Sequence, residues 1–191
     1  GRLIQILCDG MGSGNLAMQQ SQLAVHVLQI LLRGGLSIRL SLNILNTVLS
    51  FQYGGVRFST IDVSLWNLST KKIEFYKYGA APSFVKHGQD VTTYHTSSLP
   101  MGILPRVDAA IEEHILMDGD ILVMMSDGLY DLNEDGFQWE TVIGCIPTGH
   151  PQLAAEYLLA IAKSQMYSRQ KRREKMGAYK KTQNENTLGS E

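Results

Sequence analysis

Two short apolar segments, far apart in the chain, both stop at the dipeptide Asp-Gly. The first runs from Leu3 to Asp9-Gly10, and the second runs from Ile121 to Asp127-Gly128. Short runs rich in Ile, Leu and Val are typical of strands that are buried on both faces. Two such strands lying side by side would bring Asp9 and Asp127 together at one end of a sheet. Because two ionised carboxylates in contact repel each other, the pattern suggests a shared cation.

The composition predicts one globular domain in a reducing compartment. The chain has 191 residues, 44% of them hydrophobic and 18% charged, which is enough for one full core. The net charge of -1 does not indicate nucleic acid or an anionic membrane as a partner. Two cysteines, Cys8 and Cys145, make no disulfide framework, so we expect a cytoplasmic protein with Cys8 as a core residue.

The chain begins at Gly1 directly in a predicted strand, so we expect it to be part of a longer protein. No apolar run reaches the roughly 18 to 20 residues needed to span a bilayer. We therefore expect any membrane attachment to come from segments outside this chain.

The hydrophobic periodicity predicts an α+β fold in which the helices are segregated from a strand meander. Asn15 and Ser37 are candidate N-caps of two helices, the first with an apolar stripe from Leu16 to Leu31 and an end at Gly34-Gly35. The expected strands are 3–8, 58–66, 73–78, 83–86, 91–96, 111–116 and 121–125, with hairpins over 83–96 and 111–125, and a last helix is expected over 151–166.

The Asp9-Gly10 pair has two interpretations. The Asp9 carboxylate and the Gly10 carbonyl are oxygen donors of the kind that Mg²⁺ and Mn²⁺ prefer, while Asp-Gly is also one of the commonest turn dipeptides. The glycines of the following segment Met11-Gly12-Ser13-Gly14 open a helix, which favours the approach of an anion or a metal-bound phosphate.

The Asp127-Gly128 pair has the same two interpretations. If a helix begins after Asp127, Asp131 lies one turn later on the same side. Asp131 is then either a second ligand, a group that holds water, or a cap, and the sequence does not choose between these roles.

Other chemistries have weaker support. The glycines of residues 9–14 do not have the GxGxxG spacing, no lysine follows them as in a P-loop, and no βαβ unit surrounds them, so nucleotide binding is disfavoured. The five histidines have no zinc spacing, and no G-x-S-x-G motif is present. Ser59 and Thr60 are interpreted as structural.

Five motifs occur in one order: Asp9 to Gly14, Phe58 to Val63, Gly79 to Phe84, Ser98 to Leu104, and Ser126 to Gly128. Together they resemble the phosphatase domain of stage II sporulation protein E (SpoIIE), in the PPM class of metal-dependent serine/threonine phosphatases. The resemblance covers about residues 3 to 165.

This resemblance implies an αββα sandwich, two antiparallel sheets flanked by helices, with two Mn²⁺ or Mg²⁺ ions between the sheets. It implies that Asp9 bridges the two ions, that Gly10 contributes its carbonyl, and that Asp127 is a further ligand. The implied reaction is hydrolysis of phosphoserine or phosphothreonine on a partner protein, such as a phosphorylated anti-anti-sigma factor, by a metal-activated water. Asp9 and Asp127 would be the catalytic residues.

Two departures from the family pattern leave an alternative open. The family has an acidic strand before the first motif and a last strand with paired aspartates, and neither is found in this chain. We therefore expect missing edge strands. A homodimer is a separate expectation. The alternative is a catalytically incomplete module that acts in protein binding or regulation. The domain is expected over residues 1–167, followed by a basic, disordered tail over 168–191.

Overall fold

The computed structural model describes residues 1–53, 58–95, 97–131 and 137–188. The chain divides into two compact units, Gly1–Tyr130 and Asp131–Glu191. The first unit holds, in order, β1 (Arg2–Gly10), α1 (Asn15–Arg33), α2 (Ile38–Tyr53), β2 (Ser59–Asn67), β3 (Lys72–Tyr78), β4 (Ser83–His87), β5 (Asp90–Tyr94), β6 (Ala110–Ile115), β7 (Ile121–Met124) and α3 (Asp127–Tyr130). The second unit holds α4 (Trp139–Gly144) and α5 (Pro151–Leu188).

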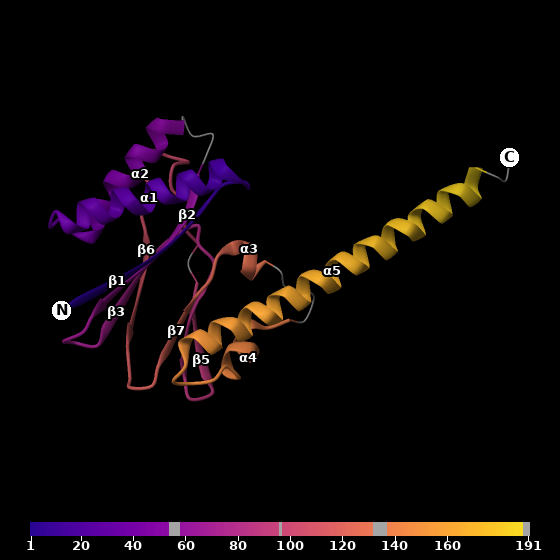
Figure 1. The fold of residues 1–191 in the computed structure, drawn as a ribbon. Helices are drawn as coiled ribbons and strands as arrows, with labels where there is room; N and C mark the ends of the chain where they lie inside the picture. Colours follow the sequence, from indigo (N-terminus) through magenta and orange to yellow (C-terminus); the bar gives the residue numbers. More distant parts are fainter. Residues whose placement is uncertain (54–57, 96, 132–136, 189–191) are drawn as a thin grey trace. The chain divides into compact units, whose positions relative to one another are not determined.

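A four-stranded antiparallel sheet with the order β1-β2-β3-β6 forms the centre of the first unit. Helices α1 and α2 cover one of its faces (Figure 1). The core between the helices and this sheet is built from apolar side chains of both layers and of Met101, which bridges to Ser59 from the segment before β6. Its other members are Ala24, Leu28, Ile38, Leu42, Leu45, Leu49, Ile61, Val63, Tyr76 and Tyr78.

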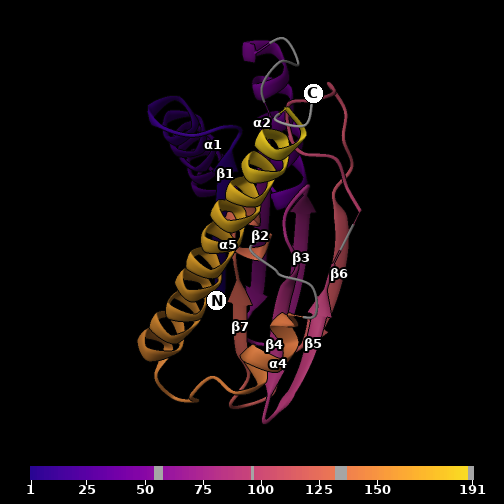
Figure 2. The ribbon, with the colours of Figure 1, turned by 90° about the vertical axis from the view of Figure 1, so that its right-hand side faces the viewer.

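A three-stranded antiparallel sheet with the order β5-β4-β7 packs on the other face of the four-stranded sheet. Ile73 and Phe75 of β3 meet Val85 of β4 and Tyr94 of β5, and the rings of Phe75 and Tyr94 stack at 4.6 Å. Figure 1 shows the two sheets as adjacent layers, and in the view of Figure 2 strands β4, β5 and β7 lie in front of the four-stranded sheet. The predicted α+β class is therefore confirmed, with helix, sheet and sheet layers inside the first unit.

The expected hairpin over 111–125 is wrong. Strand β6 pairs with β3 and strand β7 pairs with β4, so the turn at Met117 to Asp120 crosses from one sheet to the other. The turn sequence is compatible with a hairpin and with a connection between two sheets. The outcome depends on the strands with which β6 and β7 pair. Strands β1 and β7 also lie in different sheets, so the expectation that they are neighbours in one sheet is wrong.

The helix ends are partly as expected. Ser37 caps α2 by accepting a hydrogen bond from the Leu40 amide at 3.4 Å, as predicted. Asn15 is not the N-cap of α1, because the helix begins at Asn15 and Gly14 occupies the cap position. The buried residues of α1 are Ala17, Gln20, Ala24 and Leu28, one position away from parts of the predicted stripe.

Both faces of strand β2 are buried, although its sequence alternates between apolar and polar residues. Ile61 and Val63 face the helices and lie in the core. Asp62 and Ser64 on the opposite face are at most 1% exposed, because the second sheet covers them. The polar side of the alternation therefore marks an interface between sheets rather than a solvated surface.

A buried ion pair joins the two sheets. The Lys77 ammonium group on β3 donates to Asp62 Oδ2 at 2.6 Å, to the Ala81 carbonyl at 2.7 Å and to Ser83 Oγ at 2.8 Å. The Ser83 hydroxyl, on β4, donates to the same Asp62 oxygen at 2.6 Å. All three ammonium donors are thereby used. Burial lowers the pKa of Lys77, and the charge of Asp62 opposes that shift.

A second polar contact joins the sheets at the turn between β6 and β7. Asp120 accepts a hydrogen bond from the Met117 amide at 2.8 Å, and its other carboxylate oxygen lies 2.7 Å from His87 Nδ1. Burial opposes ionisation of Asp120, but the Met117 amide and the His87 ring hold its pKa below the ordinary value. His114, on β6, contacts the Tyr94 hydroxyl on β5.

In the second unit, Trp139 and Ile143 of α4 are buried, as are Ala154, Leu158 and Ala162 of α5. Helix α5 continues to Leu188, past residue 168, where the sequence shows no helical apolar pattern. The Gln170 amide donates to Glu174 one turn later at 3.1 Å, a spacing that supports a polar helix. The division into a domain over 1–167 and a tail over 168–191 stays a prediction.

None of the helices in the described part of the chain is long and apolar enough to cross a lipid bilayer.

The buried pair generates a stability prediction. Replacing Lys77→Met leaves the Asp62 carboxylate buried without its cation, so we expect the free energy of unfolding to fall by about 3–5 kcal/mol. Urea denaturation measures this loss. The double variant Lys77→Met, Asp62→Leu should recover much of it, because no unpaired charge then remains.

The matched control is Asp118→Asn, which breaks an exposed pair with Lys71 and should change stability little. A Lys77→Met protein as stable as the wild type would contradict the role given to this pair.

Candidate functional site

Asp9 and Gly10 are the last two residues of β1, and they remain inside the sheet rather than in a turn. Asp9 pairs with Thr60 and Gly10 pairs with Ser59 on β2. Side chains alternate between the faces of a strand, so Asp9 lies on the same face as Leu7, whose partner Asp62 faces the second sheet. The strand therefore places the Asp9 carboxylate at the end of the space between the two sheets.

Gly10 lies where β1 meets helix α1, and no larger residue fits there. A Cβ atom at Gly10 would lie 2.4 Å from the Ala17 carbonyl oxygen and 3.1 Å from Ser21 Oγ. The obstacle is helix backbone, which does not move without displacing α1. The close approach fixes the position of the chain beside Asp9.

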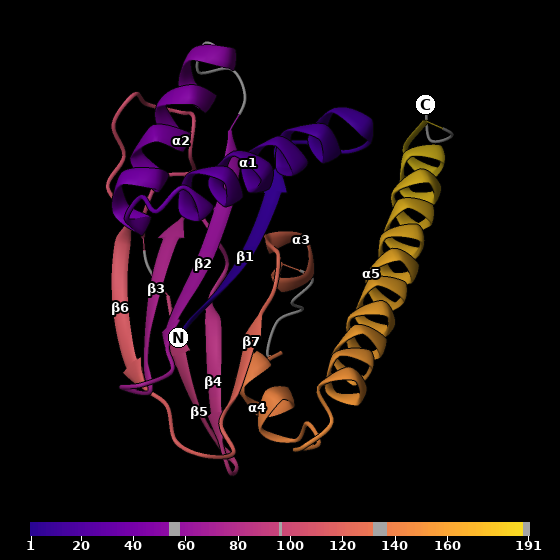
Figure 3. The same cartoon turned by 60° about the vertical axis from the view of Figure 1, so that its left-hand side comes forward.

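Asp127 reaches the same place from the other sheet. It follows β7 and begins the short helix α3, where the Ser126 carbonyl accepts hydrogen bonds from the Leu129 and Tyr130 amides. Asp127 Oδ1 accepts a hydrogen bond from the Gly128 amide at 2.7 Å. A helix does begin at Asp127, which was the condition for placing Asp131 one turn later on the same side. Figure 3 shows α3 beside the end of β1.

A pocket of about 270 Å³ contains both Asp-Gly pairs. The structure thus brings together Asp9, Gly10 and Asp127, which the sequence analysis selected as site residues. The rest of the wall comes from residues that the sequence analysis placed in motifs but not in the site itself: Met11, Gly12, Phe58, Thr60 and Gly128. Thr60, which was interpreted as structural, is one of them.

The two carboxyl groups interact directly. Burial raises the pKa of Asp9, and the charge of Asp127 and a hydrogen bond with its carboxyl raise it further, while the Gly10 amide lowers it. A raised pKa means that the ionised form of Asp9 is disfavoured beside Asp127. A cation between the two groups would reverse this penalty, so the donor set fits a hard divalent ion.

Cys8, next to Asp9, is not a reactive thiol. Its side chain packs against the core between β1 and α1, as predicted. Burial raises the pKa of the Cys8 thiol to about 12, although a hydrogen bond with Ser21 opposes the shift. The thiol stays protonated at neutral pH, which removes it as a nucleophile.

Asp131 is the first residue of the second unit, where its carbonyl accepts a hydrogen bond from the Arg169 guanidinium at 3.2 Å. Its roles as ligand, water holder or cap stay predictions. Among the described residues, no group of three or more His, Cys, Asp or Glu side chains is arranged to hold a metal ion.

The fold is that of PP2C-type phosphatase domains. The PP2C phosphatase domain with a fragment of the regulatory domain of SpoIIE from Bacillus subtilis superposes with a TM-score of 0.78 and 28% identity, over 86% of this chain and 50% of that chain. The catalytic domain of the serine/threonine phosphatase PstP, solved in complex with 2 manganese ions, shares the fold with a TM-score of 0.68 at 15% identity, over 85% of this chain and 81% of that chain.

The sequence comparisons identify the family. The model of stage II sporulation protein E (SpoIIE) matches residues 1–173, so the chain belongs to this family. It is 32% identical to stage II sporulation protein E of Bacillus subtilis (strain 168) over 158 residues, and 29% identical to that of Priestia megaterium over 163 residues. These matches cover 80% and 83% of this chain, but only 19% and 28% of those proteins.

The contact between the carboxyl groups generates a prediction that needs no metal. In protein stripped of divalent ions, Asp127→Asn removes the neighbouring charge, so the pKa of Asp9 should fall toward its ordinary value. Burial remains, so it should stay above that value. An NMR titration of the Asp9 carboxyl carbon measures the change.

Asp90→Asn serves as the control, because it removes an equal charge from the exposed β4–β5 hairpin. An Asp9 pKa that responds to neither substitution, or equally to both, would show that the two carboxyl groups do not face each other in solution.

Proposed function

We propose that this domain hydrolyses phosphoserine or phosphothreonine on a partner protein, with Asp9, Gly10 and Asp127 holding two divalent cations. The observation that carries the proposal is the meeting of Asp9 and Asp127, from different sheets, in one open pocket. Membership of the SpoIIE family and the PP2C fold support it.

The expected cofactors are two Mn²⁺ or Mg²⁺ ions. The donors are of the right kind, because carboxylate and carbonyl oxygens suit both ions. The fold relative PstP, solved with two manganese ions, favours the same choice here. When bound, such ions activate water at neutral pH and offset the charge on the phosphoryl oxygens.

The protein's own groups have distinct tasks in this proposal. Asp9 and Asp127 hold the cations from two sides, and the Gly10 backbone provides a carbonyl oxygen where no side chain fits. Met11 and Gly12 give the pocket an open rim, with Gly12 at φ 92°, a conformation that favours glycine. No histidine or cysteine is among the described lining residues, which fits attack by water rather than by a side chain.

The proposed substrate is a phosphorylated regulatory protein of the anti-anti-sigma factor type. One solved structure with this fold points toward regulation: PppA, described as a key regulatory component of T6SS in Pseudomonas aeruginosa. The RsbU and RsbW domains of Rv1364c from Mycobacterium tuberculosis share the fold. Action on such a partner, a homodimer and a cytoplasmic location are parts of the same proposal.

Mn²⁺-dependent release of phosphate from a phosphoserine protein tests the reaction. Asp9→Asn and Asp127→Asn should each lower the turnover number by about 10² or more, because each removes a ligand of the cations that would stabilise the transition-state charge. The exposed Asp90→Asn variant should keep the wild-type rate. Wild-type turnover in both site variants would contradict the proposal.

The alternative is a phosphatase-fold module that binds partners without catalysis. Titration calorimetry with Mn²⁺ separates the two. A folded protein that binds no Mn²⁺ at millimolar concentration and releases no phosphate supports the alternative, whereas Mn²⁺ binding that both site variants lose supports the enzyme.

A further inference from the structure

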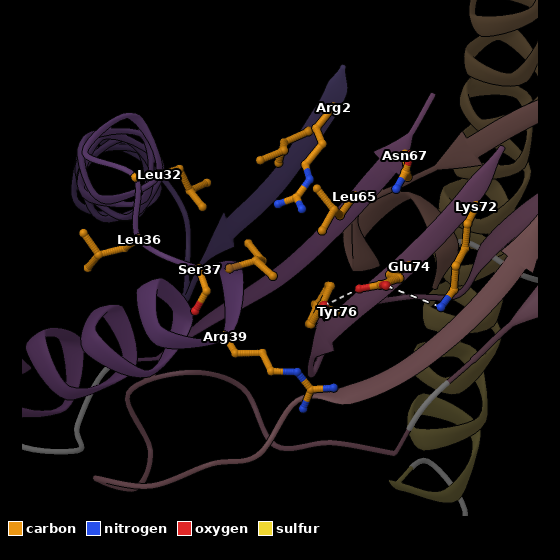
Figure 4. Close-up of a pocket in the computed structure, with 13 residues that line it drawn as sticks. Arg2, Leu32, Leu36, Ser37, Arg39, Leu65, Asn67, Lys72, Glu74 and Tyr76 are labelled. Atoms are coloured by element: carbon orange, nitrogen blue, oxygen red, sulfur yellow. Dashed lines mark hydrogen bonds and ion pairs between the residues drawn. The ribbon is translucent and has the colours of Figure 1, made fainter. Parts of the chain in front are cut away.

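A second and larger pocket, of about 530 Å³, lies at the opposite end of β1 from Asp9. It opens between the turn that joins α1 to α2 and the strands β1, β2 and β3 (Figure 4). Arg2 lines this pocket, and Asp9 lies seven residues further along the same extended strand, roughly 23 Å away at about 3.3 Å per residue. The two pockets share no lining residue.

Cationic side chains from three separate elements border the pocket: Arg2 from β1, Arg39 from α2 and Lys72 from β3. Figure 4 shows Arg2 and Arg39 extending from β1 and α2 toward the side chains of β2 and β3. Carboxylates compensate the charge of Lys72, so the excess positive charge at the pocket comes from Arg2 and Arg39, in a chain whose net charge is only -1.

The acidic groups at the pocket are already engaged by other partners. Glu74 accepts a hydrogen bond from the Tyr76 hydroxyl at 2.5 Å and lies 3.6 Å from the Lys72 ammonium group. Lys72 is bound more closely by Glu113, at 2.7 Å. Within the described residues, neither Arg2 nor Arg39 has a carboxylate within ion-pair distance. Two guanidinium groups are therefore left to bind an added anion.

Arg39 has neighbours on its other side. Arg39 also lines a smaller pocket, of about 180 Å³. Tyr76 and Asp108 line that pocket too. No ion pair forms between Arg39 and Asp108. The guanidinium group interacts with the Tyr76 hydroxyl, which places it beside the larger pocket.

The remaining walls add a polar rim and an apolar floor. Ser37 lines the pocket as the N-cap of α2, a helix of 16 residues whose N-terminus carries partial positive charge. Ile4 and Leu65 contribute apolar surface from β1 and β2. A ligand that matches both parts has an anionic group on an apolar body.

We propose that this pocket binds a small organic anion, a carboxylate or a phosphate carried on an apolar body. Guanidinium groups bind carboxylates and phosphates alike through paired N–H donors. The pocket volume of about 530 Å³ lies in the range of small-molecule sites, roughly 300–1,000 Å³. This size favours a small ligand over the flat surface of a protein partner. The site stands apart from the proposed catalytic pocket and does not rest on the proposed function.

Phenylphosphonate is the probe. It has a phosphorus–carbon bond in place of a phosphate ester, so a phosphatase does not hydrolyse it, and its ring supplies the apolar body. Titration calorimetry in EDTA, with divalent ions removed, should show saturable binding. Arg2→Gln and Arg39→Gln should each weaken binding about tenfold or more, because each removes charge-assisted hydrogen bonds. Benzoate tests the carboxylate form, and neutral benzyl alcohol should not bind.

Arg33→Gln is the matched control, since Arg33 is an exposed arginine in the last turn of α1 and does not line the pocket. The double variant Asp9→Asn, Asp127→Asn should bind phenylphosphonate like the wild type, which separates this result from any failure of the catalytic proposal.

Three outcomes would overturn the inference. The first is absence of binding by phenylphosphonate and benzoate, including the case in which only an acidic peptide binds. The second is affinity that Arg33→Gln lowers as much as Arg2→Gln and Arg39→Gln do. The third is binding that the Asp9→Asn, Asp127→Asn variant loses, which would place the probe in the other pocket.

Discussion

The structure of the first unit depends on the buried ion pair between Lys77 and Asp62. Strand β2 carries Asp62 and pairs with β1, which ends at Asp9. Strand β4 carries Ser83, the third member of the cluster, and pairs with β7, which leads to Asp127. The cluster therefore sets the relation between two sheets that each deliver one half of the site. Removing two charges from water is costly. The cost of burying Lys77 and Asp62 is compensated only while each of the three ammonium donors has its partner.

The meeting of Asp9 with Asp127 was predictable from the sequence, but the expected route was wrong. Two apolar runs ending at Asp-Gly suggested neighbouring strands, whereas β1 and β7 belong to different sheets. The prediction still succeeded, because β1 ends with Asp9 and Gly10, β7 leads to Asp127 at the start of α3, and both aspartates line one pocket. The local sequence pattern predicts where a strand ends. Which strand it pairs with depends on contacts with residues far away in the sequence.

Local patterns located most elements of the first unit. Gly34 ends α1, Ser37 begins α2, and the turn at His87 to Asp90 joins β4 to β5 as expected. The Lys77–Asp62 pair was not predictable, because a period of two separates the faces of a strand without showing whether water or a second sheet covers the polar one. Asn46 is a similar case: it lies in the apolar stripe of α2, buried, and bonds the backbone at Leu104 and Gly102.

The proposed binding of metal between Asp9 and Asp127 is tested most directly by crystallography with Mn²⁺. Crystals grown with the ion should give an anomalous peak at about 2.0–2.5 Å from carboxylate oxygens of both residues. The Gly10 carbonyl should point at the same peak. A map in which the two carboxyl groups remain in contact, with manganese absent or bound elsewhere, would contradict the account.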